Sequence, residues 1–229
     1  MINFEHVSKR YTGGVAALQD VSFELAAGEM AFLTGHSGAG KSTLLRLILM
    51  LERATRGQVI VNGRNLGKTP SRQAPQVRRG IGMIFQDHKL LSDKTVFDNV
   101  SLPLMIAGVR YPDIRRRVRA ALDKVGLLSK EKSWPLTLSG GEQQRVGIAR
   151  AIVGMPPILL ADEPTGNLDP ELSRELFNLF RQLNGQGVTV LVASHDLSLI
   201  RSMGQRVLVL ANGRLADDIA AAEIRGGGS

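Results

Sequence analysis

The sequence of 229 residues predicts an α/β fold built around a parallel sheet, and three observations carry that prediction. First, short apolar runs at 30–34, 81–85, 158–161 and 188–193 are typical of buried strands. Second, segments with helical periodicity separate these runs, as strand–helix alternation requires. Third, a glycine-rich turn at 35–42 joins the first run to a helical segment.

That turn reads GHSGAGKS and satisfies the G-x-x-x-x-G-K-S/T pattern of a phosphate-binding loop. The strand at 30–34 precedes it, and good helix formers at 43–51 follow it. Glycines let the backbone wrap closely round a polyphosphate, and the new helix offers its positive N-terminal end. We expect Lys41 to reach the β- and γ-phosphates of a nucleotide and the Ser42 hydroxyl to ligate Mg²⁺.

Composition limits the classes of function. The chain has no cysteine, which excludes disulfides and thiolate metal sites. Its apolar runs are too short to cross a bilayer, and residues 1–6 do not resemble a signal peptide, so we expect a cytoplasmic protein. The formal charge of +8 indicates either a polyanionic neighbour, nucleic acid or an anionic membrane face, or simply an arginine-rich surface.

The N-terminal third predicts strands and loops. Residues 21–25 alternate apolar and polar side chains, as in a half-buried strand, and residues 2–7 give a weaker version. Tyr11 lies in the loop between them and either stacks on a purine or covers the sheet edge. Residues 57–63 predict a strand that ends in an Asn-Gly turn, and residues 68–79, with two prolines, predict a surface loop.

From residue 87 the apolar pattern becomes helical. An apolar stripe from Ile114 to Val125 predicts a helix that Gly126 ends. Its other faces carry Arg115, Arg116, Arg117, Arg119 and Lys124, a solvated face or a membrane-proximal one. Ser139 with Glu142 three residues later forms a capping box, which predicts a helix from there to about Gly154.

The last third repeats the strand–helix pattern. An amphipathic helix is predicted at 172–183, and a hairpin strand at 207–210 with an Asn-Gly turn after it. The tail at 226–229 is expected to be flexible.

Polar side chains follow three of the predicted strands: Gln86, Asp162 with Glu163, and His195. Ligands of open α/β sheets bind beyond the carboxyl ends of the strands. An aspartate in that place is the expected Mg²⁺ partner of a P-loop ATPase, so we assign Asp162 to the metal. Glu163 beside it is placed to hold the attacking water and take its proton.

In this order the motifs resemble the nucleotide-binding subunits of ABC transporters, over residues 2–215. The most family-specific piece is the signature LSGGE at Leu138–Glu142, because other P-loop classes lack it. The resemblance implies a P-loop NTPase core of the ABC ATPase type, with an N-terminal antiparallel β sub-domain and an inset α-helical sub-domain at 87–155. We expect one ABC ATPase domain at 1–225.

The resemblance also implies residue roles. Glu163 is the catalytic glutamate, His195 the switch histidine and Gln86 the Q-loop glutamine, while 167–169 resembles the D-loop. Metal ligands are then Ser42, Gln86 and Asp162. The implied nucleotide-binding residues are Tyr11, Gly35, His36, Ser37, Gly38, Ala39, Gly40, Lys41, Ser42, Thr43, Ser139, Gly140, Gly141, Glu142 and Asp169.

The implied cofactors are ATP and Mg²⁺, and the implied assembly is a head-to-tail homodimer in which each signature closes over the partner's ATP. Residues 160–169 resemble the group of lipoprotein-releasing, macrolide-exporting and cell-division ATPases, and segments 28–40, 84–88 and 143–150 favour the cell-division branch. That branch implies an integral membrane partner resembling FtsX and contact with other division proteins, and it implies that no nucleic acid is bound. It also implies a peripheral place on the cytoplasmic face of the inner membrane, at the division site. The alternative is a subunit of a lipoprotein-releasing or macrolide-type transporter. A further hypothesis, a nucleotide-gated adaptor, has the same sequence features as the cell-division ATPase, so the sequence does not separate the two.

Two positions depart from the family pattern. Met50 and Ala54 stand where a glycine and then a proline usually follow the P-loop helix, which leaves that helix's exit open. A DNA-associated ABC ATPase would need a long coiled-coil insertion, whereas 44–137 shows no sustained heptads. A translation-factor ATPase would need two such domains in tandem.

Overall fold

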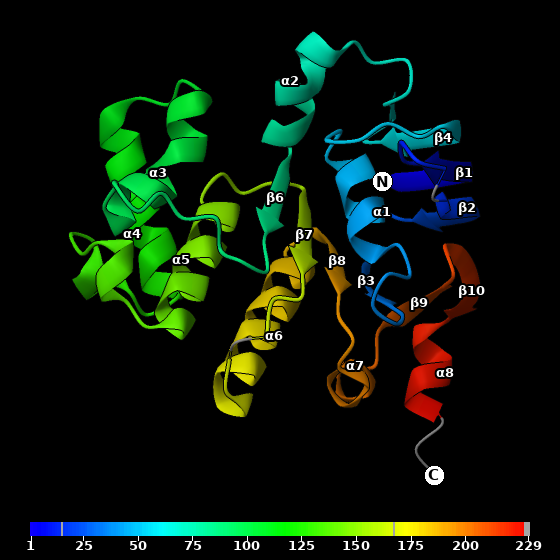
Figure 1. Cartoon of the computed structure of the whole chain (residues 1–229). Helices are drawn as coiled ribbons and strands as arrows, with labels where there is room; N and C mark the ends of the chain where they lie inside the picture. The colour runs from blue at the N-terminus through cyan, green and yellow to red at the C-terminus, as the bar shows by residue number, and fades with distance from the viewer. Residues whose placement is uncertain (15, 167, 227–229) are drawn as a thin grey trace. The chain divides into compact units, whose positions relative to one another are not determined.

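The computed structural model of the chain describes residues 1–14, 16–166 and 168–226 (Figure 1). Packing divides the chain into two compact units, one of Met1–Arg78 with Leu183–Ser229 and one of Arg79–Gln182. The helical sub-domain expected at 87–155 falls inside the second unit, and its limits stay a prediction. Of the tail expected at 226–229, Gly226 closes the last helix and 227–229 lie outside the described residues.

The first unit contains an antiparallel sheet, as expected for the N-terminal sub-domain. Its strands are β1 (Ile2–Arg10), β2 (Ala16–Leu25), β4 (Arg56–Val61) and β5 (Arg64–Asn65), in the order β2-β1-β4-β5. Phe4 lies opposite Phe23 in the pairing of β1 with β2, and their rings stack with centroids 4.8 Å apart. The predicted Asn-Gly turn joins β4 to β5, with positive φ at both Asn62 and Gly63.

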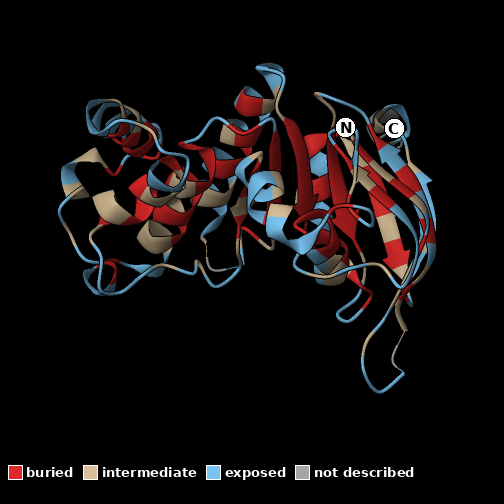
Figure 2. Cartoon of the chain, turned by 90° about the horizontal axis from the view of Figure 1, so that it is seen from above, coloured by how far each residue is buried: buried red, intermediate tan, exposed pale blue. Residues whose placement is uncertain are grey.

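The same unit holds the strands that position the glycine-rich turn. These are β3 (Met30–Thr34), β8 (Thr189–Ala193), β9 (Arg206–Ala211) and β10 (Arg214–Ile219). Strand β3 pairs parallel with both β8 and β9, and β10 pairs antiparallel with β9. Strands β3 and β8 are buried along their whole length, which is why their sequences are continuously apolar (Figure 2). Helices α1 (Lys41–Ile48), α7 (Leu197–Met203) and α8 (Ala221–Gly226) complete the unit.

Helix α1 ends cleanly despite the departure at Met50. Met50 adopts left-handed backbone with φ 54, the conformation that glycine usually supplies after a helix. The Met50 amide donates to the Leu47 carbonyl at 3.0 Å, and the Leu51 amide donates to the Arg46 carbonyl at 2.9 Å. These two bonds are the Schellman pattern, so the chain makes the usual helix exit with a strained methionine.

The surface loop predicted at 68–79 was wrong. The segment forms a 3₁₀ turn at Ser71–Gln73 and helix α2 (Ala74–Arg79). Pro75 lies in the first turn of α2, where its missing N–H breaks no helical bond. Nearby, the guanidinium of Arg53 donates to three carbonyls between Leu66 and Thr69, which orders the approach to the helix.

The second unit combines two strands with helices. Strand β6 (Ile81–Ile84) pairs parallel with β7 (Ile158–Asp162). Helices α3 (Val96–Ile106), α4 (Tyr111–Lys124) and α5 (Gly140–Ile152) pack on one another, and α5 also contacts β6. Short 3₁₀ turns lie at Leu128–Lys130 and Pro135–Thr137, and α6 (Pro170–Gly185) follows β7.

The helix predictions for this unit were confirmed. On α4 the predicted apolar stripe is buried, and Gly126 follows the helix with φ 67. Between residues 44 and 137 the longest helix is α4, with 14 residues, so this region holds no long coiled coil. Among the described residues, no helix combines the length and apolarity that a membrane span requires.

Candidate functional site

The phosphate-binding pattern forms a tight turn between β3 and α1. Gly40 is the residue before the helix and has φ 111; a Cβ there would lie 2.6 Å from the Ala17 carbonyl oxygen. The Gly213 amide donates to the Ala39 carbonyl at 3.1 Å, so the β9–β10 turn holds the loop from outside. The helix starts at Lys41, and its first backbone bond joins the Leu44 amide to the Gly40 carbonyl at 2.9 Å. The loop therefore has the strand–turn–helix context that the motif requires.

Lys41 folds back over this loop. Its ammonium donates to the Gly35 carbonyl at 2.7 Å and to the His36 carbonyl at 3.4 Å. The positive charge is thus held beside the start of α1, where the helix dipole also favours an anion.

Tyr11 is tied to the same helix. Its hydroxyl lies 3.4 Å from the Thr43 hydroxyl, and the Lys9 ammonium lies 4.9 Å from the centre of its ring. Lys9 in turn pairs with Glu52 at 2.7 Å. One face of the ring therefore carries a cation, a contact that polarises and orients an aromatic side chain.

His195 follows β8, the strand beside β3, and lies between the strand and α7. The buried Ser194 before it donates its amide to the Leu33 carbonyl at 3.1 Å. Asp196 after it caps α7, because its Oδ1 accepts from the Leu199 amide at 3.1 Å. The hydrogen bond from the Ser198 hydroxyl, and then that from the Leu199 amide, lower the pKa of the Asp196 carboxyl. The structure thus brings His195 and the P-loop to the carboxyl ends of adjacent strands in one unit.

In the second unit, Gln86 follows β6 and is exposed, and Asp162 is the last residue of the neighbouring strand β7. Glu163 comes next and has a left-handed backbone with φ 47. A non-glycine residue in this region is strained, and such strain persists where the surroundings over-determine it, often at active sites. Gln86 and Asp162 with Glu163 therefore lie at strand ends of the second unit and His195 at a strand end of the first, and their functional roles stay a prediction.

The signature segment caps α5 as the sequence predicted. The Ser139 hydroxyl accepts from the Glu142 amide at 3.3 Å, and Glu142 Oε2 accepts from the Ser139 amide at 2.9 Å. The Lys130 ammonium donates to Glu142 Oε1. The hydrogen bond from Lys130 and that from the Ser139 amide hold the pKa of Glu142 below its usual value. A Cβ on Gly141 would lie 3.0 Å from the side chain of Leu172, so the backbone here runs close to α6.

Asp169 has a visible structural role. Its Oδ1 accepts from the amides of Glu171 and Leu172 at 3.0 and 2.9 Å, which caps the start of α6. Asn167, part of the predicted D-loop, lies outside the described residues.

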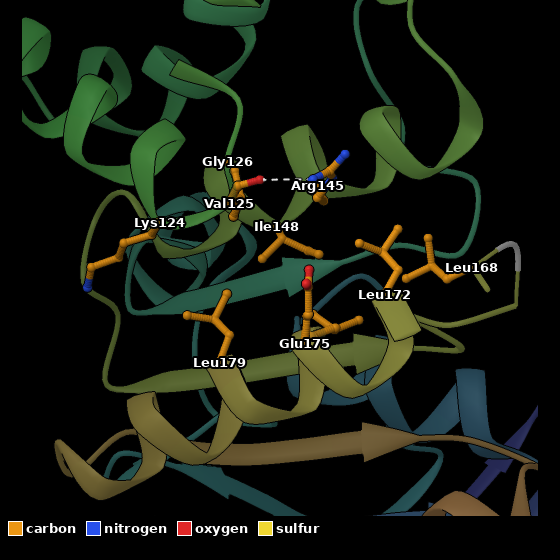
Figure 3. Close-up of a pocket in the computed structure, with 10 residues that line it drawn as sticks. Lys124, Val125, Gly126, Arg145, Ile148, Leu168, Leu172, Glu175 and Leu179 are labelled. Atoms are coloured by element: carbon orange, nitrogen blue, oxygen red, sulfur yellow. Dashed lines mark hydrogen bonds between the residues drawn. The ribbon is translucent and has the colours of Figure 1, made fainter. Parts of the chain in front are cut away.

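A cavity of about 150 Å³ lies between α5 and α6, within the second unit (Figure 3). Leu172, Glu175 and Leu179 project from α6 toward the helix that carries Arg145 and Ile148. Its lining, in the described part of the chain, includes no residue that the sequence predicted to bind nucleotide.

The structure also reveals polar contacts that the sequence did not predict. Gln144 is 2% exposed and donates from Nε2 to the Pro164 carbonyl at 2.8 Å, while His88 Nδ1 contacts its Oε1. Arg150 donates to the carbonyls of His88 and Lys89 at 2.6 and 2.7 Å, and burial lowers the pKa of its guanidinium. Nothing in local spacing points to these pairs, because the partners are up to 62 residues apart in the chain.

Comparisons with known proteins cover most of the chain. The family model for the ABC transporter matches residues 18–166. The Cell division ATP-binding protein FtsE of Escherichia coli K12 is 60% identical over 94% of this chain and 97% of its own length. The protein of the same name from Haemophilus influenzae is 53% identical over 94% of this chain and 99% of its own.

A solved structure has the same fold. The ATP-binding cassette MJ0796, described as a dimer in a post-hydrolysis state bound to ADP and Pi, superposes with a TM-score of 0.91. It is 33% identical in sequence, over 96% of this chain and 99% of that one. The fold and family predicted from the sequence are therefore confirmed, and the chain belongs to the ABC transporter family as one of its ATP-hydrolysing subunits.

Proposed function

We propose that this ATPase is the nucleotide-driven subunit of a cell-division complex, working as a homodimer with an integral membrane partner resembling FtsX. The observation that carries the proposal is the identity of 60% to a cell-division ATP-binding protein over nearly the whole chain. The lipoprotein-releasing or macrolide-type alternative is not favoured by these relatives. We infer a peripheral place on the cytoplasmic face of the inner membrane at the division site. There, closure of the dimer would signal through the partner to cell-wall hydrolases.

ATP is held, in this proposal, by the turn at 35–43. The Lys41 ammonium leaves its loop carbonyls for the phosphates, which are stronger acceptors for a cation. The base stacks on the face of Tyr11 opposite Lys9.

Mg²⁺ fits the donors that the sequence predicted. Magnesium in ATPases usually takes one or two carboxylates, water and substrate phosphates rather than a full protein cage. Among the described residues, no group of three histidine, cysteine or acidic side chains could hold a metal by itself. Oxygen atoms of Ser42, Gln86 and Asp162 would complete the shell with the phosphates.

Hydrolysis is assigned to Glu163, His195 and Gln86. Glu163 takes a proton from the attacking water, since a carboxylate beside the metal aspartate is placed for general-base work. His195 donates to the γ-phosphate, and Gln86 orients water and metal. In the homodimer, Ser139 and the start of α5 face the partner's γ-phosphate, which the helix dipole favours.

The membrane partner docks, in this proposal, on the segment 90–105 of the second unit. Large apolar side chains are exposed at its two ends, at Leu91 and Met105, and continue at Ile106 and Tyr111. Large apolar side chains that are exposed in this way are often part of interaction sites.

A single substitution tests the proposed chemistry. Glu163→Gln should keep ATP binding, lower the hydrolysis rate by about 10²- to 10⁴-fold and accumulate an ATP-bound dimer, because general-base catalysis is lost. Light scattering with and without ATP measures the dimer, and phosphate release measures the rate. Glu171→Gln, an exposed glutamate near the start of α6, is the matched control. Turnover near that of the unmodified protein would reject the assignment of Glu163.

A further inference from the structure

Gln144 joins two segments that the proposed mechanism uses. Its Nε2 donates to the Pro164 carbonyl at 2.8 Å, and Pro164 directly follows Glu163. A carbonyl can only accept, which fixes the amide orientation, so Oε1 faces His88 and Nδ1 of His88 carries the proton. His88 lies two residues after Gln86. One buried amide therefore connects the loop after β6 to the loop after β7.

The loop after β6 is itself held under strain. His88 and Lys89 are consecutive non-glycine residues with left-handed backbone, at φ 57 and 49. Both of their carbonyls accept hydrogen bonds from the guanidinium of Arg150 on α5. Strained backbone persists only where its surroundings over-determine it, and here Gln144 and Arg150 of helix α5 hold the loop.

The loop after β7 is held from the same helix. Glu163 has φ 47, and the proline ring fixes φ of the next residue near −65°. Because the peptide bond between them is planar, a hydrogen bond to the Pro164 carbonyl also restrains the backbone that aims Glu163.

We propose that Gln144 is a positioning residue for ATP hydrolysis. It holds the loop that carries Glu163 and the loop that carries Gln86 in fixed positions relative to helix α5. The proposal rests on the assignment of Glu163 as general base. Gln144 is buried, so its role is indirect: it acts through the Pro164 carbonyl on one side and His88 on the other. Since α5 begins with the signature, a displacement of that helix reaches the Glu163 loop through Gln144, and the Gln86 loop through Gln144 and Arg150.

Gln144→Leu removes both hydrogen bonds at nearly constant volume. A misplacement of about 1 Å at a catalytic group can cost about 10²-fold in rate. We expect kcat to fall about 10-fold or more while KM for ATP stays within about two-fold, because the P-loop is not touched. The full chain with Mg²⁺ and ATP is assayed for phosphate release, and thermal unfolding is followed in parallel.

Gln143→Leu is the matched control on the same helix. The Nε2 of the native Gln143 donates to the carbonyls of Pro135 and Leu138 at 3.1 and 3.2 Å, and it has no hydrogen bond to the loop after β6 or the loop after β7 among those of the described residues. It should keep kcat within about two-fold even if its melting temperature falls. Equal losses of kcat in the two variants would overturn the proposal.

His88 supplies a second, independent arm. Asn at this position keeps an N–H donor near the place of Nδ1, whereas Ala removes it. We expect His88→Asn to keep kcat within about three-fold and His88→Ala to lose about as much as Gln144→Leu. The double variant His88→Ala/Gln144→Leu should lose no more than the worse single one, because both break one chain of contacts. If Gln144→Leu does not fold, the His88 variants still test the proposed positioning role.

The result that overturns the inference differs from the one that overturns the proposed function. If Glu163→Gln abolishes turnover but Gln144→Leu and His88→Ala leave kcat within two-fold, the positioning role is wrong. If Glu163→Gln turns over normally, both proposals fail together. In a Glu163→Gln background, Gln144→Leu should cause no further loss of rate, and a further loss of 10-fold would show that Gln144 acts by another route.

Discussion

Single residues with left-handed backbone mark the places where packing, rather than local preference, sets the conformation. Gly40 is the clearest case, because a Cβ there would meet both the Ala17 carbonyl and the Leu18 side chain, at 2.6 and 2.7 Å. Gly38, two residues earlier, also has positive φ, but no described atom lies within 4 Å of its Cβ position. The two glycines of one loop are therefore needed for different reasons.

Gly40→Ala should lower the free energy of unfolding by about 3 kcal/mol, because the added methyl group meets backbone that cannot move away. Gly38→Ala should cost about 1 kcal/mol, the cost of left-handed backbone alone. Urea denaturation of both variants without nucleotide measures the difference. Equal losses would mean that the close contact at Gly40 does not exist.

The sequence predicted that the P-loop needs glycines for a close turn, but it did not predict the left-handed backbone of Met50, His88, Lys89 and Glu163. A glycine in a turn indicates that positive φ is possible, because it has no Cβ. A methionine or glutamate with φ near 50° goes against its local conformational preference. His88 is held by Arg150, a partner remote in the chain, whereas Met50 is held by the local hydrogen bonds at the end of α1. For the same reason the Gln144 contacts could not be found from spacing.

At the scale of elements, the capping box of α5 was predicted from the sequence, and the structure shows a second one on α3. Both α3 and α5 begin with a capping box, at Thr95 with Asp98 and at Ser139 with Glu142. The error at α2 came from reading Pro75 as a helix breaker, although proline is tolerated in a first turn. Capping is a local signal within four residues, so sequence alone can carry it.

The two capping boxes give a matched pair of substitutions. Ser139→Ala and Thr95→Ala should each lower the free energy of unfolding by about 1 kcal/mol, the usual worth of a side-chain cap. Only Ser139→Ala should also slow ATP hydrolysis, since that hydroxyl is assigned to the partner's nucleotide. Parallel urea titrations and phosphate-release assays compare them. An equal loss of rate in Thr95→Ala would reduce Ser139 to a purely structural cap.

The Lys130–Glu142 pair predicts an acid dependence. Because the folded pKa of Glu142 is lowered, its contribution to stability is present above the ordinary carboxyl value, near pH 4.5, and is lost as pH falls through the folded pKa. Lys130 is partly exposed, so the contribution should be less than about 1 kcal/mol. Lys130→Gln should therefore flatten the fall in the free energy of unfolding below pH 4.5. Urea midpoints measured from pH 7 to 3 check this, and an unchanged slope would contradict it.

At the scale of the whole molecule, the predicted site residues are divided between the two compact units. Tyr11, the P-loop and His195 belong to one unit, and Gln86, Asp162, Glu163 and the signature belong to the other. Motif spacing identified each group because each lies at strand ends or a helix start. Their joint role came from the family resemblance, because no local pattern in either unit specifies the other.

Recruitment to a membrane tests the complex as a whole. Co-expression with an FtsX-like partner should move the protein to the membrane fraction, and Met105→Asp, at a side chain 59% exposed, should abolish that shift. Charge reversal at Arg115–Arg117 should weaken it only modestly, since a basic residue near anionic lipid contributes about 1 kcal/mol.

Met155→Asp is the control for this experiment, because Met155 is 74% exposed in the same unit but outside the segment 90–105. It should leave recruitment unchanged. Tight membrane binding without any partner, or salt-sensitive DNA binding, would contradict the scheme.

The left-handed backbone at Glu163 has a consequence for how this position would change over evolutionary time. Gly, Asn and Asp relax such a backbone, whereas Gln and Ala keep the strain. A copy of this gene released from selection for hydrolysis would gain stability by replacing the glutamate with one of those three residues. A glutamate retained here in a diverging copy would then report continued selection for turnover, and a glycine or asparagine would identify a copy that binds ATP as a clamp without consuming it.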